Sequence, residues 1–467
     1  MPDTASALVL EDGFTRDLCA RLASVSYDDL PHDVVQAVKL FVLDTLGCIG
    51  GAAGQPGLDA VLARLGQWET GGDATMLLGR HRVSPPTAAF ANAASAHALD
   101  FDDQHDPARV HAYCVSLPAA LAAAEAAGDV DGRQLILALA LGVELHSRLG
   151  LACYDSIGRG WTPTVLFGGL AAAVAAGKVL GLDGAGLLNA MGIAYSQGAG
   201  NMLSRDDGAY TKRLAPGYAA RTGVLSAFLA ADGVTGPWRV LEGTFGLFRL
   251  YERGEVNPGI VTEGLGETWH LRDISMKPYP CCRCCHTVIQ LALDLRGEGV
   301  SPGDIEAVEI YMGAVNHEAV CGPYRPELKS PLHAQFSAAY GFARALVDGR
   351  VDLSSYTEGA IVAPAVAALA ARTDVRIDPD IPRTATEPAW IRARLAGGAV
   401  RDLRRDAMKG SPADPMAPDD VREKLRGCLR FGLGASNADA DRLAEAVAAL
   451  DSAADIRGLI TAFPEAI

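Results

Sequence analysis

Aromatic residues make up only 6% of this chain of 467 residues, and it has only ten cysteines. So few cysteines in so long a chain exclude a small scaffold held together by disulfides. Basic residues are also in deficit, because 41 Lys and Arg face 56 Asp and Glu and leave a net charge of −15. A field of that sign repels nucleic acid and anionic membrane surfaces, so we expect neither as a partner.

Long apolar runs are missing as well. The two most apolar windows, 135–143 and 165–177, are shorter than the roughly 18–20 residues that a membrane span requires. Residues 1–14 contain three acidic side chains and lack the positive segment and apolar core that are typical of a signal peptide. We therefore expect a cytoplasmic protein that does not insert into membranes.

Several catalytic signatures are absent too. The sequence has no Gly-x-Gly-x-x-Gly loop, no Gly-x-x-x-x-Gly-Lys-Ser/Thr loop, no Gly-x-Ser-x-Gly elbow and no His-Glu-x-x-His pair. We therefore expect no nucleotide cofactor, no serine nucleophile and no catalytic zinc. Acid–base chemistry on an anionic substrate is the enzymatic function that these absences leave open.

What the sequence does contain is 49% hydrophobic residues and 51 glycines. Up to about residue 267 the apolar positions recur at helical spacing. This spacing predicts helices at 85–99, 117–127, 132–151, 165–182, 187–199 and 217–233. Their faces carry Ala and Gly more than Leu and Phe, so we expect these helices to approach one another closely.

Near residue 269 the pattern changes. Alternating residues predict a strand at 308–311 and a hairpin formed by 390–395 and 400–403, joined through Gly397 and Gly398. Helices are predicted between these strands, at 287–296, 337–347 and 362–372. The fold class is therefore mainly α: residues 1–269 and 406–467 form one large helical domain, and 270–405 form a smaller inserted α+β domain.

The densest polar segment runs from Asp100 to Asp106 and is followed by His111. One interpretation is an acidic turn in solvent. Another is the Asp102-Asp103-x-x-Asp106 pattern, with which isoprenoid synthases bind magnesium pyrophosphate, because carboxylates suit hard cations. That class needs a second metal motif, which is absent here. A part of an active site is the third interpretation.

Two further segments are rich in cations. Residues 204–213 are expected to form a loop that either lies in solvent or clamps a carboxylate through Lys212 and Arg213. Residues 277–286 contain two overlapping Cys-x-x-Cys spacings, which leave zinc, redox chemistry or buried thiols open. No second pair of cysteines is available, so buried thiols are favoured. Lys277 and Arg283 are the members of this segment that we expect to matter, because the prolines beside Lys277 stiffen its loop.

Several motifs, in order along nearly the whole chain, resemble the MmgE/PrpD family. They are His97-Ala98-Leu99-Asp100-Phe101-Asp102-Asp103, His111, Pro118-Ala119-Ala120, Thr211-Lys212-Arg213-Leu214, Gly217-Tyr218-Ala219-Ala220, Ala230–Pro237 with Leu241-Glu242-Gly243, Lys277-Pro278-Tyr279-Pro280 and Ala334-Gln335-Phe336-Ser337. The family includes 2-methylcitrate dehydratase, cis-aconitate decarboxylase and iminodisuccinate epimerase. The resemblance implies a helical domain built from both chain ends, an α+β lid domain, a homodimer and a cofactor-free site between the domains.

The resemblance also implies the site residues. The family's catalytic positions fall on Asp100, His111, Lys212, Lys277 and Tyr324. Residues expected to bind the substrate are Gln104, Thr162, Arg205, Arg213 and Arg283. In these roles the lysines stabilise charge that develops beside a substrate carboxylate, and His111 transfers the proton with Asp100 orienting it or a neighbour.

Three departures from the family pattern bear on the reaction, and together they argue against a simple cis-aconitate decarboxylase or 2-methylcitrate dehydratase. One is the loop from Asp100 to His111, which is one residue longer than in the decarboxylases. The family's Gly-Trp-His-Pro-Thr is Gly160-Trp161-Thr162-Pro163-Thr164 here, so one imidazole is lost, and Gln104 replaces a threonine. The expected function is a lyase of the dehydratase type acting on a small di- or tricarboxylate. An isomerase or epimerase, a decarboxylase, or a catalytically silent paralogue that binds a carboxylate are the alternatives.

Overall fold

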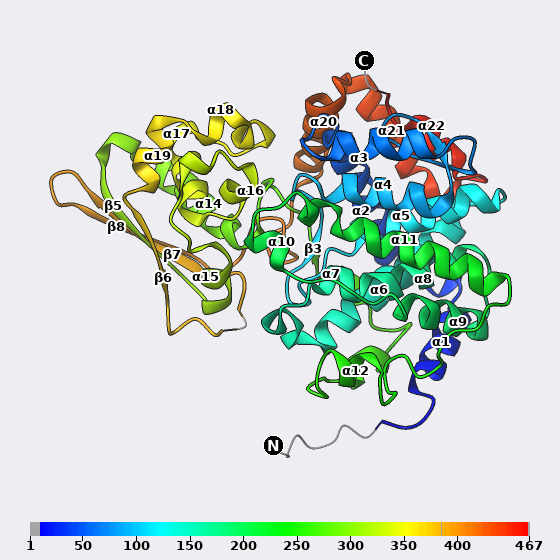
Figure 1. The fold of residues 1–467 in the computed structure, drawn as a ribbon. Coiled ribbons are helices and arrows are strands. Elements are labelled where there is room, and N and C mark those ends of the chain that lie inside the picture. The colour runs from blue at the N-terminus through cyan, green and yellow to red at the C-terminus, as the bar shows by residue number, and fades with distance from the viewer. Residues whose placement is uncertain (1–9, 384, 466–467) are drawn as a thin grey trace. The chain divides into compact units, whose positions relative to one another are not determined.

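A computed structural model describes residues 10–383 and 385–465. The extreme ends of the predicted helical domain, 1–9 and 466–467, lie outside the described residues. The chain forms two compact units, drawn in Figure 1. Among the described residues, the helical unit comprises 10–98, 102–274 and 422–465, and the mixed unit comprises 99–101, 275–383 and 385–421.

Helices account for most of the described chain, which confirms the mainly α fold class. The longer helices of the helical unit are α1 (Phe14–Ser24), α2 (His32–Gly51), α3 (Leu58–Trp68), α4 (Pro85–His97), α5 (Tyr113–Ala127), α6 (Gly132–Ala152), α8 (Gly168–Val179), α9 (Gly184–Tyr195), α11 (Thr211–Ala231), α20 (Pro418–Leu433, from residue 422 on) and α21 (Asn437–Ala448). Shorter helices are α7 (Pro163–Leu166), α10 (Leu203–Asp206), α12 (Leu247–Leu250), α13 (Gly259–Thr262) and α22 (Arg457–Ala462).

Small residues let α11 approach its neighbours, as the composition predicted. A Cβ added at Gly223 would lie 2.3 Å from the Ala172 Cβ in α8. A Cβ added at Gly217 would lie 2.7 Å from the carbonyl oxygen of Phe90 in α4. Both separations are shorter than any real carbon contact, so a side chain at either position would push the helices apart.

The C-terminal helices of the helical unit lie against its N-terminal ones, as the red and blue ribbons in Figure 1 show. A Cβ at Gly432 of α20 would lie 2.1 Å from the carbonyl oxygen of Gly50 in α2. The same two helices share a buried ion pair, in which Lys424 Nζ lies 2.6 Å from Asp44 Oδ1. Residues nearly four hundred positions apart therefore meet in one core.

The region of residues 204–213 is not the simple loop that the sequence predicts. α10 covers Leu203–Asp206, and α11 begins at Thr211 rather than at Gly217, so Lys212 and Arg213 lie in the first turn of a helix. The predicted helix starts at Gly217, but α11 includes Pro216 as an internal residue. A proline inside a helix costs a backbone hydrogen bond and crowds the preceding turn, so the packing of α11 against α4 and α8, rather than its local sequence, keeps this turn helical.

Two helices contradict the expectation that no apolar run is long enough to cross a membrane. α2 has 20 residues and α6 has 21, and both are apolar enough to span a bilayer by length and composition. The fold buries 78% of the apolar window of α2 and 89% of that of α6. Burial of that extent is typical of helices in a protein core.

The mixed unit contains a four-stranded sheet in the order β6-β5-β7-β8. Its strands are β5 (Ile305–Met312), β6 (Thr373–Ile377), β7 (Ala389–Leu395) and β8 (Val400–Arg405). β6 pairs with β5 in parallel and the other pairs are antiparallel, so the predicted hairpin of β7 and β8 is confirmed. The rings of Tyr311 in β5 and Trp390 in β7 are cross-strand partners and stack 3.8 Å apart.

Helices complete the mixed unit. They are α14 (His286–Gly297), α15 (Ala314–Val320), α16 (Pro331–Gln335), α17 (Ala338–Asp348), α18 (Glu358–Ile361) and α19 (Pro364–Ala370). The predicted helix 362–372 is shorter than expected, because the chain turns into β6 after Ala370. β6 was missed because its residues are mostly polar and exposed and lack the apolar alternation of a half-buried strand.

Candidate active site

The acidic segment between α4 and α5 is buried. Asp102 and Asp103 have no exposed surface, and Asp106 is 3% exposed. The interpretation as an acidic turn in solvent is therefore wrong. A buried carboxylate needs hydrogen bonds or an opposite charge to offset the loss of water, and the described contacts supply them.

Asp103 holds the start of α5. Its carboxylate accepts hydrogen bonds from the backbone N–H groups of Ala112, at 3.0 Å, and Tyr113, at 3.2 Å. These are donors that a helix start otherwise leaves unsatisfied. Burial, with a contribution from the Asp102 charge, raises the pKa of Asp103 to about 8. Asp103 is thus a positioning residue for the segment that carries His111, and it is no available ligand for magnesium.

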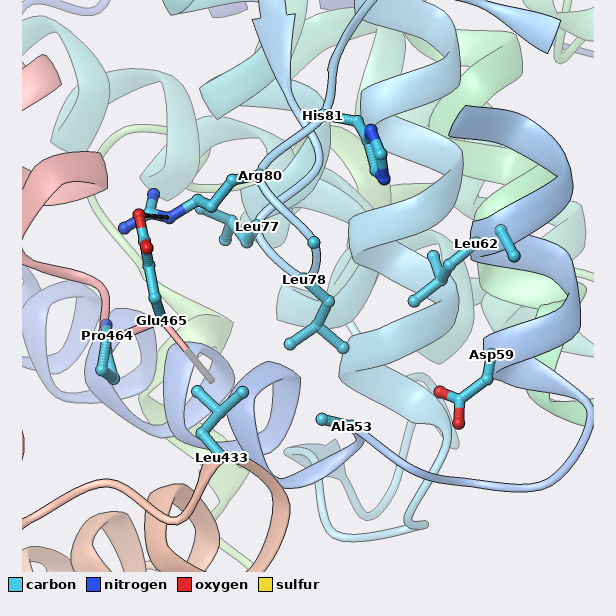
Figure 2. Close-up of a pocket in the computed structure, with 12 residues that line it drawn as sticks. Ala53, Asp59, Leu62, Leu77, Leu78, Arg80, His81, Leu433, Pro464 and Glu465 are labelled. Atoms are coloured by element: carbon cyan, nitrogen blue, oxygen red, sulfur yellow. Dashed lines mark ion pairs between the residues drawn. The ribbon is translucent and has the colours of Figure 1, made fainter. Parts of the chain in front are cut away.

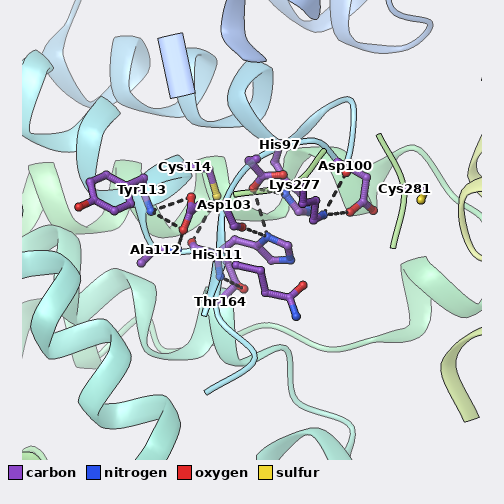
Figure 3. A network of polar contacts seen from close by, with 12 residues as sticks. His97, Asp100, Asp103, His111, Ala112, Tyr113, Cys114, Thr164, Lys277 and Cys281 are labelled. Carbon is purple, nitrogen blue, oxygen red and sulfur yellow. Dashed lines mark hydrogen bonds and ion pairs between the residues drawn. The ribbon is translucent and has the colours of Figure 1, made fainter. Parts of the chain in front are cut away.

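Two imidazoles meet at Asp102, those of His97 and His111, and both residues are labelled in Figure 3. His97 Nδ1 lies 2.8 Å from Asp102 Oδ2, and His111 Nδ1 lies 3.4 Å from the same oxygen. The two rings pack edge to face, with their centroids 4.8 Å apart. In the sequence His97 is only one member of a family motif, and the structure adds it to the group around His111.

The contacts of His111 determine which ring nitrogen can act as a base. Its Nδ1 donates a hydrogen bond to the backbone oxygen of Asp103 at 2.6 Å, so Nδ1 carries the proton. Nε2 is then the basic nitrogen of the neutral ring. The backbone N–H of His111 donates to Thr164 Oγ1 at 3.0 Å, which fixes the main chain at this residue. The side chain is 16% exposed, whereas His97 is 5% exposed.

The two residues that depart from the family pattern form local contacts. Thr162 Oγ1 donates to the backbone oxygen of Asn201 at 3.0 Å. Gln104 Nε2 donates to Asp106 Oδ1 at 3.2 Å. Neither side chain is fully buried, and neither carries a group that titrates near neutral pH. Their roles in substrate binding stay predictions.

The cations of residues 204–213 differ in their surroundings. Burial and the charges of Asp102 and Asp103 raise the pKa of the Cys114 thiol, and the half-buried Lys212 ammonium acts in the opposite direction. Lys212 therefore belongs to the electrostatic surroundings of the Asp102 cluster. Arg213 is buried beside the Tyr210 ring, 5.6 Å from its centroid, and Arg205 pairs with its neighbour Asp206 at 2.6 Å.

The mixed unit contains a second polar group, the pair of Lys277 and Asp100. Lys277 Nζ donates to Asp100 Oδ1 at 2.6 Å and to the backbone oxygen of Asp100 at 3.0 Å (Figure 3). Lys277 has no exposed surface and Asp100 is 3% exposed. Asp100 has a φ of +54°, a left-handed conformation that Asp tolerates better than most residues. Two buried hydrogen bonds from Lys277 Nζ thus hold Asp100 in this conformation.

The cysteines after Lys277 are buried or half-buried thiols without a disulfide among the described residues. Cys281 and Cys285 belong to the hydrophobic core of the mixed unit, which supports the interpretation as buried thiols. Arg283, also buried, donates to the backbone oxygen of Lys409 at 2.6 Å and to His286 Nδ1 at 3.1 Å. These contacts tie its guanidinium to the mixed unit's own main chain.

Tyr324 lies elsewhere in the mixed unit. Its hydroxyl donates to the backbone oxygen of Ile361, and its ring stacks on His333 with centroids 5.6 Å apart. Burial raises the pKa of Tyr324 to about 12. In this arrangement the phenol is a hydrogen-bond donor with little tendency to ionise near neutral pH.

A cavity of about 460 Å³ opens in the helical unit, but no predicted site residue lines it. Figure 2 shows Leu62, Leu77, Leu78 and Leu433 around it. At its edge Arg80 Nε lies 3.6 Å from Glu465 Oε1. Asp59, His81 and Glu465 also line this cavity, but none of the residues of the family motifs does, so it is not the candidate site.

The structure therefore brings the predicted residues together in two groups. In the helical unit His111 joins His97, Asp102 and Asp103, with Lys212 in their electrostatic range. In the mixed unit Asp100 joins Lys277. Only Phe101 separates Asp100 from Asp102 in the chain.

Comparisons with known proteins agree with the motifs. The MmgE/PrpD N-terminal domain matches residues 16–258, and the MmgE/PrpD C-terminal domain matches residues 279–450. Cis-aconitate decarboxylase of Aspergillus terreus is 30% identical over 368 residues, which cover 74% of each chain. Cis-aconitate decarboxylase-like protein oryM of Aspergillus oryzae is 29% identical and covers 96% of this chain and 97% of its own.

The human cis-aconitate decarboxylase is 29% identical over 431 residues, which cover 88% of this chain and 87% of that protein. The two domain matches together extend over most of the chain and follow the order of the motifs. The chain therefore belongs to the MmgE/PrpD family.

Proposed function

We propose that this protein is a carboxy-lyase that removes carbon dioxide from a small di- or tricarboxylate, with His111 as the proton donor. The observation that carries the proposal is the setting of His111, whose Nδ1 donates to the Asp103 backbone at 2.6 Å while its ring remains partly exposed. The names of the relatives, cis-aconitate decarboxylases, support decarboxylation as the reaction class.

Decarboxylation places few demands on proton transfer. When the bond to the carboxylate breaks, carbon dioxide leaves and its electron pair stays on the substrate carbon. That carbon then needs one proton. His111 in its imidazolium form can deliver it from Nε2 and return to the neutral ring, whose Nδ1 proton stays on the Asp103 oxygen. Asp102, 3.4 Å from Nδ1, stabilises the imidazolium before the transfer.

The replacement of the family's imidazole by Thr162 removes one group that could transfer a proton. Thr162 stands where other family members have an imidazole, and its hydroxyl donates to the Asn201 backbone. A reaction that needs one proton transfer tolerates this loss better than one that needs a separate acid and base. Decarboxylation is compatible with the loss for this reason, although the family pattern that carries the imidazole includes decarboxylases as well as dehydratases.

The substrate's negative charges require cations. Lys212 is the half-buried cation in the electrostatic range of the Asp102 cluster, so we assign it to a substrate carboxylate. Lys277 donates to both the side chain and the backbone of Asp100, so its first role in this proposal is to hold Asp100 in place.

A hydro-lyase is the second candidate. Dehydration needs a base to remove one proton and an acid to protonate the leaving hydroxyl. The edge-to-face pair of His97 and His111, 4.8 Å between centroids, offers two imidazoles for these tasks. His97 is more deeply buried than His111 and bonded to Asp102, which makes this candidate weaker.

The test is to incubate the purified protein with cis-aconitate, citrate and 2-methylcitrate in D₂O and to follow the products by NMR and by release of carbon dioxide. A carboxy-lyase releases carbon dioxide and places one deuterium on the carbon that lost it or, in an unsaturated acid, on the far end of the allylic system. A hydro-lyase changes the substrate without releasing carbon dioxide. An epimerase exchanges a proton and keeps the composition, whereas a protein that only binds leaves every acid unchanged.

Variants then test the assignment of His111. We expect His111→Gln to lower kcat at least 100-fold, because one positioned acid or base typically contributes about 10²–10⁴-fold to a rate. His81→Gln is the matched control, since His81 is an exposed imidazole of the same unit. Full activity of His111→Gln on the true substrate would contradict the proposal.

A further inference from the structure

Three different metal-binding side chains meet where α4 ends and α5 begins. The ligand atoms of His97, Asp102 and Cys114 all lie within 4.8 Å of one another. Among the residues that the structure describes, this is the only such group of three or more His, Cys, Asp or Glu. His97 is 5% exposed, and the other two residues have no exposed surface.

The spacing of these atoms is close to what a zinc site needs. Zinc binds His nitrogen and carboxylate oxygen at about 2.0–2.2 Å and cysteine sulfur at about 2.3 Å, so its tetrahedral ligands stand roughly 3.3–3.8 Å apart. In this cluster His97 Nδ1 and Asp102 Oδ2 are 2.8 Å apart, and no pair exceeds 4.8 Å. If the three side chains moved by about 1 Å, their ligand atoms would therefore surround a cation at these bond lengths.

The cluster also has the donor types for a thiophilic metal. An imidazole, a carboxylate and a thiol together suit Zn²⁺ and Co²⁺ rather than Mg²⁺ or Ca²⁺, which prefer oxygen ligands alone. At present a hydrogen bond holds His97 Nδ1 and Asp102 together. A cation placed between these two atoms displaces the Nδ1 proton to solvent and provides a positive charge beside the buried carboxylate.

We propose that His97, Asp102 and Cys114 form a site for one thiophilic divalent cation, of the class of Zn²⁺ and Co²⁺. The cation binds His97 Nδ1, an Asp102 carboxylate oxygen and Cys114 Sγ as thiolate, and a water molecule or an anion takes the fourth position. Cys114 releases its thiol proton to solvent on binding and gives up the hydrogen bond that its Sγ donates to the backbone oxygen of His111 at 3.4 Å. The partly exposed His111 ring packs edge to face on His97 at this site.

Occupation of this site would inhibit the enzyme under the proposed function. The metal takes the Asp102 carboxylate, whose oxygen lies 3.4 Å from His111 Nδ1, and so removes a group that stabilises the His111 imidazolium. Metal binding itself does not depend on that function. The site can therefore be tested without measuring any reaction, and its failure would leave the carboxy-lyase proposal untouched.

The experiment is a titration of the reduced, metal-free protein with Co²⁺, followed by ultraviolet and visible absorption. A cobalt–thiolate bond gives a charge-transfer band in the near ultraviolet, which reports sulfur ligation directly. We expect one equivalent of Co²⁺ to bind with this band, and Zn²⁺ to displace it. Cys114→Ser should abolish the band.

Two other cysteines serve as matched controls. Cys153→Ser alters a buried free thiol of the same unit that is outside the cluster and should keep the band. Cys282→Ser removes a half-buried thiol of the mixed unit and should also keep it. His97→Gln leaves Cys114 in place, so we expect the band at saturating Co²⁺ with affinity at least tenfold weaker.

Several results would overturn the proposal. One is the absence of bound Co²⁺ in the wild-type protein. Another is a band that survives Cys114→Ser or disappears with Cys282→Ser, since either places the thiolate ligand elsewhere. If Cys114→Ser does not fold, His97→Gln decides, because unchanged Co²⁺ affinity in that variant excludes His97 as a ligand.

Discussion

Replacing Lys277 by Met tests how strongly the mixed unit depends on its buried ion pair. Lys277 Nζ lies 2.6 Å from Asp100 Oδ1, and the two residues are 0% and 3% exposed. Removal of the ammonium leaves the Asp100 carboxylate in the interior without this partner. Breaking a buried pair in this way costs about 3–5 kcal/mol in the free energy of unfolding.

The complementary change is Asp100→Asn. Asn tolerates the left-handed φ of +54° at this position, so the backbone conformation is retained while the charge is lost. This variant buries the Lys277 ammonium with its bond to the Asp100 backbone oxygen as the remaining contact of the pair. We expect a loss of about 3 kcal/mol, at the lower end of the range for a broken pair.

The double variant carries the critical information. Because both charges are gone, it should be more stable than the sum of the two single losses implies, by about 2–3 kcal/mol. Urea unfolding followed by far-ultraviolet circular dichroism gives the four free energies of the cycle. Additivity of the two changes within about 0.5 kcal/mol would refute the view that this pair is an energetic unit.

A second buried pair provides the control for function. Lys424 and Asp44 are 2.6 Å apart, with side chains 4% and 1% exposed, and lie between α20 and α2. Lys424→Met and Asp44→Asn should show a similar coupling in stability. We expect turnover per folded molecule to fall in the Lys277 and Asp100 variants and to stay unchanged in these controls.

Three further predictions concern packing, helix capping and acid stability. Gly223→Ala should lower the free energy of unfolding by about 1–3 kcal/mol, since the added Cβ meets Ala172 at 2.3 Å. Gly427→Ala is the control, because a Cβ added there has no neighbouring atom within 4 Å. It should raise the free energy of unfolding by up to about 1 kcal/mol in the same urea assay. Asp103→Ala should lower it by about 1–3 kcal/mol, because the N–H groups at the start of α5 lose their acceptor. Burial lowers the pKa of His146 to about 3, below the unfolded value of about 6.5, so the unfolded chain binds more protons and stability falls as the pH drops from about 6.5 towards 3. At pH 5 this residue should lower the free energy of unfolding by about 2 kcal/mol. His146→Gln should therefore reduce the loss of stability between pH 7 and pH 5 by about that amount, whereas His81→Gln, at an exposed site, should leave the loss unchanged. An unaltered pH dependence of stability in His146→Gln would contradict the assignment.

The sequence by itself determined the local structure well where a pattern repeats. Apolar spacing predicted α6 over 132–151, and the structure has it at Gly132–Ala152. Two glycines between alternating runs predicted the β7–β8 hairpin. These features depend on residues that are close in the chain, so their physical cause is already present in a short stretch of sequence.

Local reasoning failed where contacts outside a segment decide its structure. The predicted helix begins at Gly217, but α11 begins at Thr211 and includes Pro216, because packing against neighbouring helices offsets the cost of an internal proline. β6 was missed because a sheet partner, rather than its own apolar pattern, keeps it extended.

For the candidate site, too, some features followed from the sequence and others only from the tertiary structure. The motifs identified His111, Asp100 and Lys277 by residue type and order, because chemistry limits which side chains can transfer protons or hold charge. Only the tertiary structure decided that Asp103 caps α5, that Asp102 joins two imidazoles and that Cys114 lies beside them. Burial and pairing arise from segments that fold against one another, and these long-range contacts turn an acidic stretch of sequence into a buried network.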